Sequence, residues 1–177
     1  MRTVGTLVFA GIVLMAGGCA DIPKYDLSPA IEFAGIDQFD SEDALGNPVK
    51  LVRITLAFED GDGDLGEDPQ SEERRNFLEA NGGWGNYRVE VLRLQNEKWE
   101  RHPMPLLDSI PLMFPFLKTD GSRGPIRGKL DFDIDFPPGT GSKITPLKFI
   151  VKIRDRELRE SNIVETDSIL VPVFDDL

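Results

Sequence analysis

Cysteine and histidine are almost absent from this chain. Among its 177 residues there is one cysteine, Cys19, and one histidine, His102. A single cysteine excludes a disulfide within the chain, and so few soft ligands exclude the usual zinc sites. A serine or cysteine nucleophile would need a histidine base, and no serine motif lies beside His102. Since phosphate-binding and dinucleotide-binding motifs are also missing, we expect a protein that is not an enzyme.

Basic residues are scarce as well. The chain has 20 lysines and arginines against 31 aspartates and glutamates, and its formal net charge is −11. A chain this acidic is a poor candidate for binding nucleic acid or for direct adhesion to anionic lipid. The charge is compatible with divalent cations, with basic partners, or simply with solubility.

The one long apolar run lies at the N-terminus, and at 4–16 it is shorter than the ~20 residues of a membrane-spanning helix. It follows a basic start and precedes small residues and Cys19, which is typical of a secretory signal. The segment resembles a bacterial lipoprotein signal, in which the cysteine is acylated and becomes the new N-terminus, although Ala16 stands where such signals usually carry leucine. Secretion without a lipid is the alternative.

The lipoprotein interpretation divides the chain into three parts. We expect a signal peptide over 1–18, an acylated tether over 19–28, and one domain over 29–177. One acyl chain anchors a protein only marginally, so several acyl chains on Cys19 would hold it stably at a membrane.

A period of two residues dominates the expected domain. Three segments alternate apolar and polar side chains, which is typical of strands with one face in a core and one in water. They are 52–58, 129–136 and 147–154, where Lys148, Lys152 and Arg154 are expected in water. Weaker candidate strands cover 30–36, 87–95, 110–116 and 163–174. Short strands without a long helical pattern predict an all-β fold, an antiparallel β-sandwich of about seven strands.

One long insertion interrupts this pattern between the strands that end at Phe58 and begin at Tyr87. It contains a predicted short helix over 71–80. Pro69 suits a first helical position with Asp68 as its cap, and Asn81-Gly82 is a helix stop. Long loops inside compact domains are usually functional or mobile.

An acidic loop opens this insertion. Asp60, Asp62 and Asp64 alternate with Gly61 and Gly63, so the backbone can turn tightly while the carboxylates converge. Converging carboxylates repel one another unless a cation neutralises them. Ca²⁺ fits best, because it takes about six to eight oxygen ligands in irregular geometry. The alternative is a solvated acidic turn that binds no metal.

Two further acids are candidate metal ligands. Asp68 is either a ligand or the helix cap, and Asp155 follows the third strong strand. Loops at one end of a sandwich gather together, so Asp155 is expected to face the acidic loop, unless it is an ordinary turn acid. The EF-hand frame is matched only in part, because Leu65 replaces the required glycine and Ser71 the required glutamate.

Three other features have both a structural and a functional interpretation. We expect a solvated acidic stripe, rather than a second cation site, at Asp131, Asp133 and Asp135. The proline-broken apolar segment 102–117 is interpreted as a connection with apolar residues in the core, the alternative being a partner-docking segment. Trp84 and Trp99 are expected to pack in the core or a hairpin, with ligand anchoring as the alternative.

Two motifs link the chain to a known group of proteins. FEDGDGDLG over 58–66 and DRELRESNIVET over 155–166 resemble the paired motifs of small uncharacterised lipoproteins of Bacteroidota. The resemblance covers most of 28–174 and implies an immunoglobulin-like sandwich at the outer membrane, with no established activity.

These observations predict a lipid-anchored outer-membrane protein with a calcium-stabilised sandwich. We expect it to be a non-catalytic interaction or accessory module with an envelope protein partner. The alternative is a glycan- or peptide-binding accessory lipoprotein of a nutrient transporter, with Trp84 and Trp99 exposed on a concave face.

Overall fold

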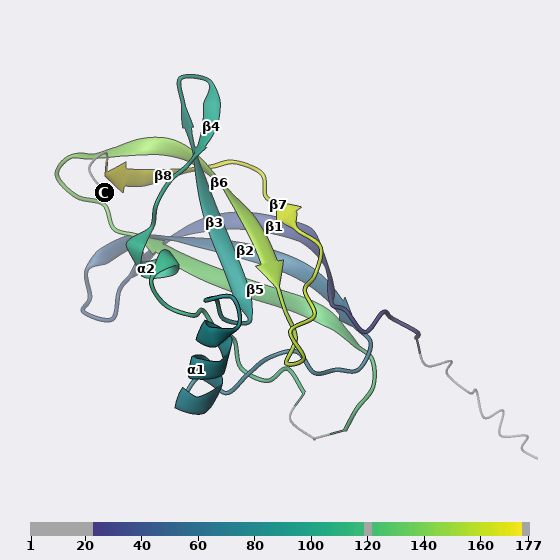
Figure 1. Ribbon diagram of the computed structural model, residues 1–177. Coiled ribbons are helices and arrows are strands. Elements are labelled where there is room, and N and C mark those ends of the chain that lie inside the picture. The colour runs from purple at the N-terminus through teal and green to yellow at the C-terminus, as the bar shows by residue number, and fades with distance from the viewer. Residues whose placement is uncertain (1–22, 119–121, 175–177) are drawn as a thin grey trace, which may run out of the picture.

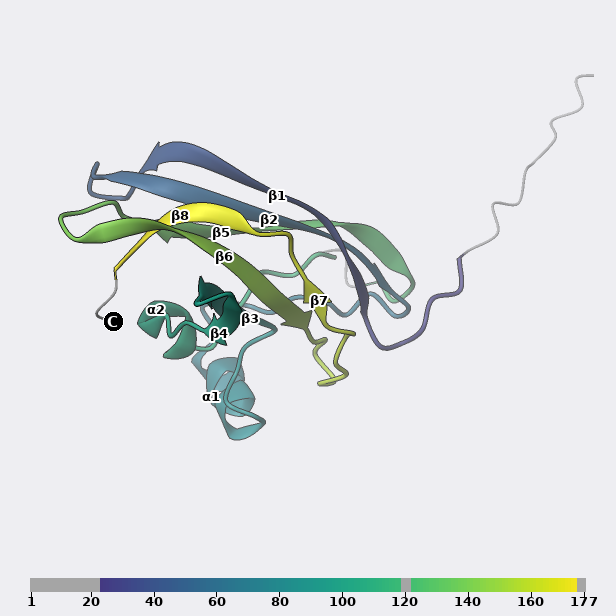
Figure 2. The same cartoon turned by 90° about the horizontal axis from the view of Figure 1, so that it is seen from above.

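Two antiparallel β-sheets stack face to face (Figures 1 and 2). The computed structural model describes residues 23–118 and 122–174, so the expected signal peptide and Cys19 lie outside the described residues. The first sheet has the order β1-β2-β5, from strands β1 (Ala30–Glu42), β2 (Pro48–Asp60) and β5 (Ile126–Phe136). The second has the path β4-β3-β6-β7, with β8 also paired to β6. Its strands are β3 (Tyr87–Gln95), β4 (Lys98–Arg101), β6 (Ser142–Ile153), β7 (Val164–Glu165) and β8 (Ile169–Phe174).

The strand order is that of an immunoglobulin-like sandwich, as predicted. Strands β1, β2 and β5 take the places of A, B and E in one sheet, and β3, β6 and β8 take those of C, F and G in the other. The alternating apolar residues of β2, β5 and β6 supply most of the core between the sheets. Their fully buried members are Val52, Ile54, Leu56, Leu147, Phe149, Val151 and Ile153.

The three strongly alternating segments are strands, and the acidic stripe of β5 is exposed as expected. On that outer face Arg53 pairs with Asp133 at 2.6 Å, and Thr55 donates a hydrogen bond to Asp131. Two weaker strand predictions need correction. Segment 163–174 is divided into β7 and β8, and 110–116 forms no named strand.

The segment 110–116 is irregular because prolines interrupt it, and its only ladder contact is an isolated bridge between Pro115 and Glu67. Phe114 nevertheless reaches the core, so the connecting role expected for 102–117 is confirmed for part of the segment. Ile110 and Phe116 remain 53% and 40% exposed. A short helix, α2 (Pro105–Asp108), lies within the same connection.

The predicted helix is present as α1 (Glu72–Ala80), which lies outside the two layers beside one end of β3 (Figure 1). Its cap is Ser71, whose hydroxyl accepts a hydrogen bond from the Arg74 amide, so the prediction of Asp68 and Pro69 at the helix start is wrong. Asn81 ends the helix as predicted. Neither α1 nor α2, the helices of the described ranges, is long and apolar enough to cross a membrane.

The described N-terminal segment and the end of β8 lie at opposite ends of the sandwich (Figures 1 and 2). The N-terminal segment contacts the loop that follows β2. A Cβ atom added to Gly61 would lie 2.6 Å from the Asp26 carbonyl oxygen and 2.7 Å from that of Tyr25. The acidic loop is therefore at the end of the domain where the expected tether enters.

Candidate metal centre

Asp60 organises the acidic loop from the end of β2. Its side chain is fully buried, and its Oδ2 accepts hydrogen bonds from the amides of Gly63 at 2.7 Å and Asp64 at 3.1 Å. These bonds close a tight turn directly after the strand. Gly63 sits at φ +74, and a Cβ there would collide with the Gly124 carbonyl oxygen, so glycine is required at this point of the turn.

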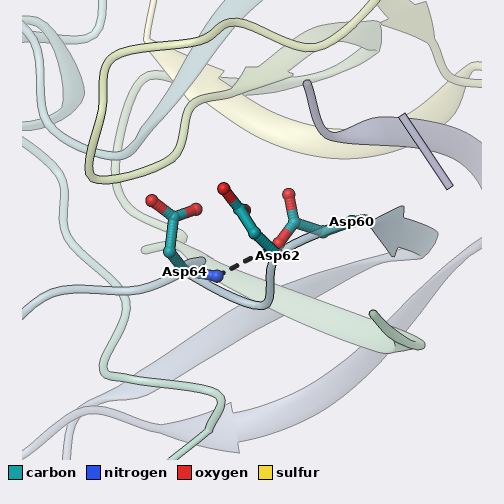
Figure 3. Close-up of side chains that lie close together, drawn as sticks. All are labelled: Asp60, Asp62 and Asp64. Carbon is teal, nitrogen blue, oxygen red and sulfur yellow. Dashed lines mark hydrogen bonds between the residues drawn. The ribbon is translucent and has the colours of Figure 1, made fainter. Parts of the chain in front are cut away.

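The turn brings three carboxylates together. Asp60, Asp62 and Asp64 each offer one oxygen, and these oxygens lie within 4.8 Å of one another. Figure 3 shows the three side chains projecting to the same side of the loop. In each residue the Oδ1 atom is buried and has no hydrogen-bond partner among the described residues. Buried polar atoms are normally paired, so three unpaired acceptors that converge form a group that could hold a cation.

The electrostatics of the loop agree with this geometry. Burial, together with the neighbouring Asp62 and Asp155 carboxylates, raises the pKa of Asp60 to about 6. Burial and repulsion from Asp155, Asp62 and Asp60 raise the pKa of Asp64 to about 7. The site thus resists the ionised form of these acids, and a divalent cation would favour that form by neutralising the crowded charge.

Asp155 faces the acidic loop, as expected. It is buried, and burial raises its pKa. Its own oxygens are engaged by Arg159, whose amide donates to Oδ1 at 2.8 Å and whose Nη1 donates to Oδ2 at 3.3 Å. The same Nη1 donates to Asp62 Oδ2 at 3.1 Å. Arg159 therefore joins Asp155 to the loop, and Asp155 borders the carboxylate group without being part of it.

Asp68 lies apart from the other candidate ligands. It is exposed, outside the group formed by the three loop aspartates, and its Oδ1 accepts from the Gln70 amide at 2.9 Å. The sequence predicted Asp68 to be either a metal ligand or the helix cap. In the structure Asp68 instead forms part of the turn that precedes Ser71.

A second buried polar group lies beside the first, and sequence reasoning missed it. Arg154 was expected in water, but it is 2% exposed. Its guanidinium donates to the carbonyls of Gly85 at 2.8 Å, Asn81 at 2.6 Å and Leu78 at 3.3 Å, and also to that of Trp84. Arg154 therefore holds the end of α1 and the following turn against β6.

Three more residues complete this group. Buried Asn86 mimics a strand partner, because its Oδ1 accepts from the Phe114 amide and its Nδ2 donates to the Phe114 carbonyl, both at 2.8 Å. Buried Glu67 pairs with Arg74 of α1. Together with Arg154 they fasten the insertion and the segment 112–114 to the sandwich. We name Arg154, Asn86, Glu67 and Arg74 the anchor cluster.

The 155–166 motif also has a clear structural basis. Asn162 pairs with both backbone groups of Ile31, at 2.9 and 2.8 Å, and so ties β1 of one sheet to the segment that follows β6 of the other. Ser161 and Thr166 accept hydrogen bonds from the amides of Ile153 and Phe149, each at 3.0 Å. These residues hold the sandwich edge, whereas Asp155 contributes to the acidic site.

The two tryptophans lie near opposite ends of β3. Trp84 precedes the strand and is covered by the Arg154 guanidinium, 4.2 Å from its ring centre. Trp99 of β4 pairs with Leu94 and lies under Lys148 at 4.6 Å. Both are half-buried, and they do not form a joint aromatic platform.

Comparisons with known proteins found no relative. No family model, no curated protein and no solved structure matches the chain. Its function is therefore inferred from its own residues.

Proposed function

We propose that this protein is a lipid-anchored envelope protein that acts as a non-catalytic interaction or accessory module of an outer-membrane complex. Its sandwich is stabilised by one Ca²⁺ ion held by Asp60, Asp62 and Asp64. The observation that carries the metal site is the convergence of three buried carboxylate oxygens without partners. The observation that carries the anchor is the signal-like segment ending at Cys19.

Calcium suits the donor set better than other biological cations. All donors are oxygens, which hard cations prefer, and the described cluster contains no histidine. The three aspartates come from one turn. Ca²⁺ tolerates the irregular ligand geometry that a turn offers, whereas Mg²⁺ demands near-ideal octahedral geometry. Asp62 uses Oδ2 for Arg159 and keeps Oδ1 for the ion.

Binding of the ion would stabilise a part of the fold that has little core of its own. The acidic loop connects β2 to the insertion and touches the tether at Tyr25 and Asp26. A ligand that binds only the folded state stabilises it by about 2.7 kcal/mol at about a hundredfold excess over Kd. Calcium would therefore fix the tether, the loop and the end of the sandwich relative to one another.

Isothermal titration calorimetry tests the metal site directly. The chain from residue 20 to 177 contains every described strand and helix, and it should bind one Ca²⁺. Asp62→Asn should lose most of that affinity. The matched control Asp135→Asn changes an exposed aspartate of β5 and should leave it unchanged. Absence of Ca²⁺ binding to the wild-type chain would refute the metal site.

The anchor has a separate test. Expressed in a bacterium with an outer membrane, the full chain should incorporate labelled fatty acid and partition with outer-membrane fractions, and Cys19→Ser should abolish both. Recovery of the Cys19→Ser protein in the same membrane fraction would contradict lipid anchoring. A partner that crosslinks to the wild-type chain and not to the soluble variant would identify the complex.

A further inference from the structure

A cavity opens beside the three aspartates, and its lining is of mixed charge. It has a volume of about 300 Å³. Two of the loop carboxylates line it, together with three cations and one further acid. The charged lining residues are Asp62, Asp64, Lys118, Arg123, Arg156 and Glu157.

The cations of this cavity are placed on separate segments. Lys118 follows the apolar connection, and its Nζ lies 3.5 Å from the Gly124 carbonyl oxygen, a long hydrogen bond. Arg156 follows Asp155, and its guanidinium stacks 5.2 Å from the ring centre of Phe116. Stacking on Phe116 leaves the edges of the guanidinium available as donors. The cavity therefore presents directed cationic donors next to the candidate metal centre.

Metal occupancy decides the charge of this cavity. Without a cation, the carboxylates of Asp62, Asp64 and Glu157 oppose the three cations. A divalent cation held by the loop aspartates would leave an excess of positive charge. It would also keep coordination positions open, because three carboxylates do not fill the about six to eight oxygen positions of Ca²⁺.

We infer that this cavity binds a phosphate-bearing group together with Ca²⁺, with phosphate oxygens reaching the ion and the donors of Lys118 and Arg156. This inference rests on the proposed calcium site. The guanidinium group of arginine and Ca²⁺ both bind anionic oxygens. A phosphate has several such oxygens, so it can bridge the two. The volume of about 300 Å³ admits a phosphorylated headgroup or a small soluble phosphate ester.

The position of the tether favours a lipid headgroup as the source. Residues 25 and 26 lie against Gly61 of the acidic loop, and Tyr25 lies six positions after Cys19. A chain of that length spans at most about 20 Å when fully extended. In a protein anchored at Cys19 the cavity would thus lie near the phosphates of the membrane surface. Binding through the ion would not require a basic protein surface, which this chain lacks.

Calorimetry with sn-glycerol 3-phosphate tests the cavity in the chain 20–177. The compound should bind in saturating Ca²⁺, and at least about tenfold more weakly in chelator. Arg156→Gln and Lys118→Gln should each weaken it about tenfold, because each removes a charged donor. Both variants should still bind Ca²⁺, which shows that they are folded. Lys98→Gln, on the exposed part of β4, is the matched control and should change nothing.

The possible outcomes distinguish a failure of phosphate binding in the cavity from a failure of calcium binding at the metal site. Binding of Ca²⁺ without binding of glycerol 3-phosphate overturns the inference and leaves the calcium site intact. Equal phosphate binding in Ca²⁺ and chelator, or no effect of either variant, also overturns it. If Ca²⁺ itself does not bind, the proposed function fails, and the metal-dependent cavity fails with it.

Sedimentation with vesicles distinguishes the two sources of phosphate. The chain 20–177 lacks Cys19, so sedimentation cannot result from a lipid on that residue. Co-sedimentation with phosphatidylglycerol vesicles in Ca²⁺, lost in chelator and in Arg156→Gln, supports a lipid headgroup. Binding of glycerol 3-phosphate without co-sedimentation supports the phosphate site with a soluble ligand and overturns the headgroup as its source.

Discussion

Two neighbouring groups of buried polar side chains, the anchor cluster and the acidic loop bordered by Asp155, differ in how completely they are paired. In the anchor cluster the buried Arg154 guanidinium donates to four backbone carbonyls, and Asn86 is satisfied by Phe114. In the acidic loop three buried Oδ1 atoms have no partner among the described residues. Arg159 pairs with Asp62 and Asp155 but reaches neither Asp60 nor Asp64 through any described hydrogen bond.

This difference distinguishes a polar group with a structural role from a group that could bind a ligand. A fully paired polar group fixes neighbouring segments and needs nothing more, whereas each unpaired buried acceptor costs free energy that a ligand can recover. The anchor cluster is complete within the chain. In the acidic loop three buried carboxylate oxygens are left without such partners, and this group could hold a cation.

The largest expected effect comes from breaking the anchor cluster. Arg154→Leu would leave four carbonyls around a buried apolar side chain, so we expect a loss of about 3 kcal/mol in the free energy of unfolding. Urea denaturation measures it. Arg88→Leu makes the same change at an exposed position of β3 and should alter stability by less than about 0.5 kcal/mol. Equal effects of the two substitutions would show that the anchor cluster does not hold the insertion.

A smaller loss of stability is expected when one side chain of the anchor cluster, which makes two hydrogen bonds, is removed. Asn86→Ala would strip the buried amide and carbonyl of Phe114 of their partners, and we expect a cost of about 2 kcal/mol. Hydrogen exchange at the Phe114 amide should accelerate by more than exchange in β6. In Asn76→Ala, which changes an exposed residue of α1, exchange at Phe114 should stay as in the wild type. Unchanged protection of Phe114 in Asn86→Ala would contradict the pairing.

The pH dependence of stability in the absence of metal tests the crowding of carboxylates in the acidic loop. Asp60 and Asp64 have pKa values of about 6 and 7 in the folded chain, above the ordinary value of 3.8. Between about pH 4 and 7 these two carboxyl groups therefore hold more protons in the folded than in the unfolded chain, so their contribution to stability falls as pH rises. In chelator, the midpoint of urea unfolding should be lower at pH 8 than at pH 5. A midpoint that rises from pH 5 to pH 8 would contradict the raised pKa values of the crowded carboxylates.

The smallest expected effect is a gain in stability. Asp64→Asn removes one of the crowded charges, so in chelator at pH 8 the variant should be more stable than the wild type by about 1 kcal/mol. The same variant should no longer be stabilised by Ca²⁺. Asp135→Asn, at an exposed position with solvent around it, is the control for both measurements. A destabilised variant in chelator would show that Asp64 serves the fold and not a ligand.

Much of the sandwich could be predicted because its information is local. In β2, β5 and β6 every second side chain points into the core, and this two-residue period can be recognised from the sequence alone. The acidic loop was predicted for the same reason, since Asp60, Asp62 and Asp64 converge within a single turn. The helix cap was misplaced by a few residues because Asp68 and Ser71 are both good cap residues.

The anchor cluster could not be predicted, because its contacts join distant parts of the chain. Arg154 occupies a position that alternation assigns to water, yet its partners lie 69 to 76 residues earlier, in the turn after α1 and in α1 itself. Asn86 meets Phe114 across 28 residues. The segment 110–116 was predicted as a strand because it is apolar, but its prolines and its attachment to Asn86 make it an irregular connection that buries Phe114.

The central claim is that the acidic loop is completed by calcium, and urea unfolding of residues 20–177 in Ca²⁺ and in chelator tests it most directly. At neutral pH and about a hundredfold excess of Ca²⁺ over Kd, the free energy of unfolding should rise by about 2.7 kcal/mol, and Asp62→Asn should remove the rise. Identical unfolding curves in Ca²⁺ and in chelator would show that the three carboxylates form a strained turn without a metal.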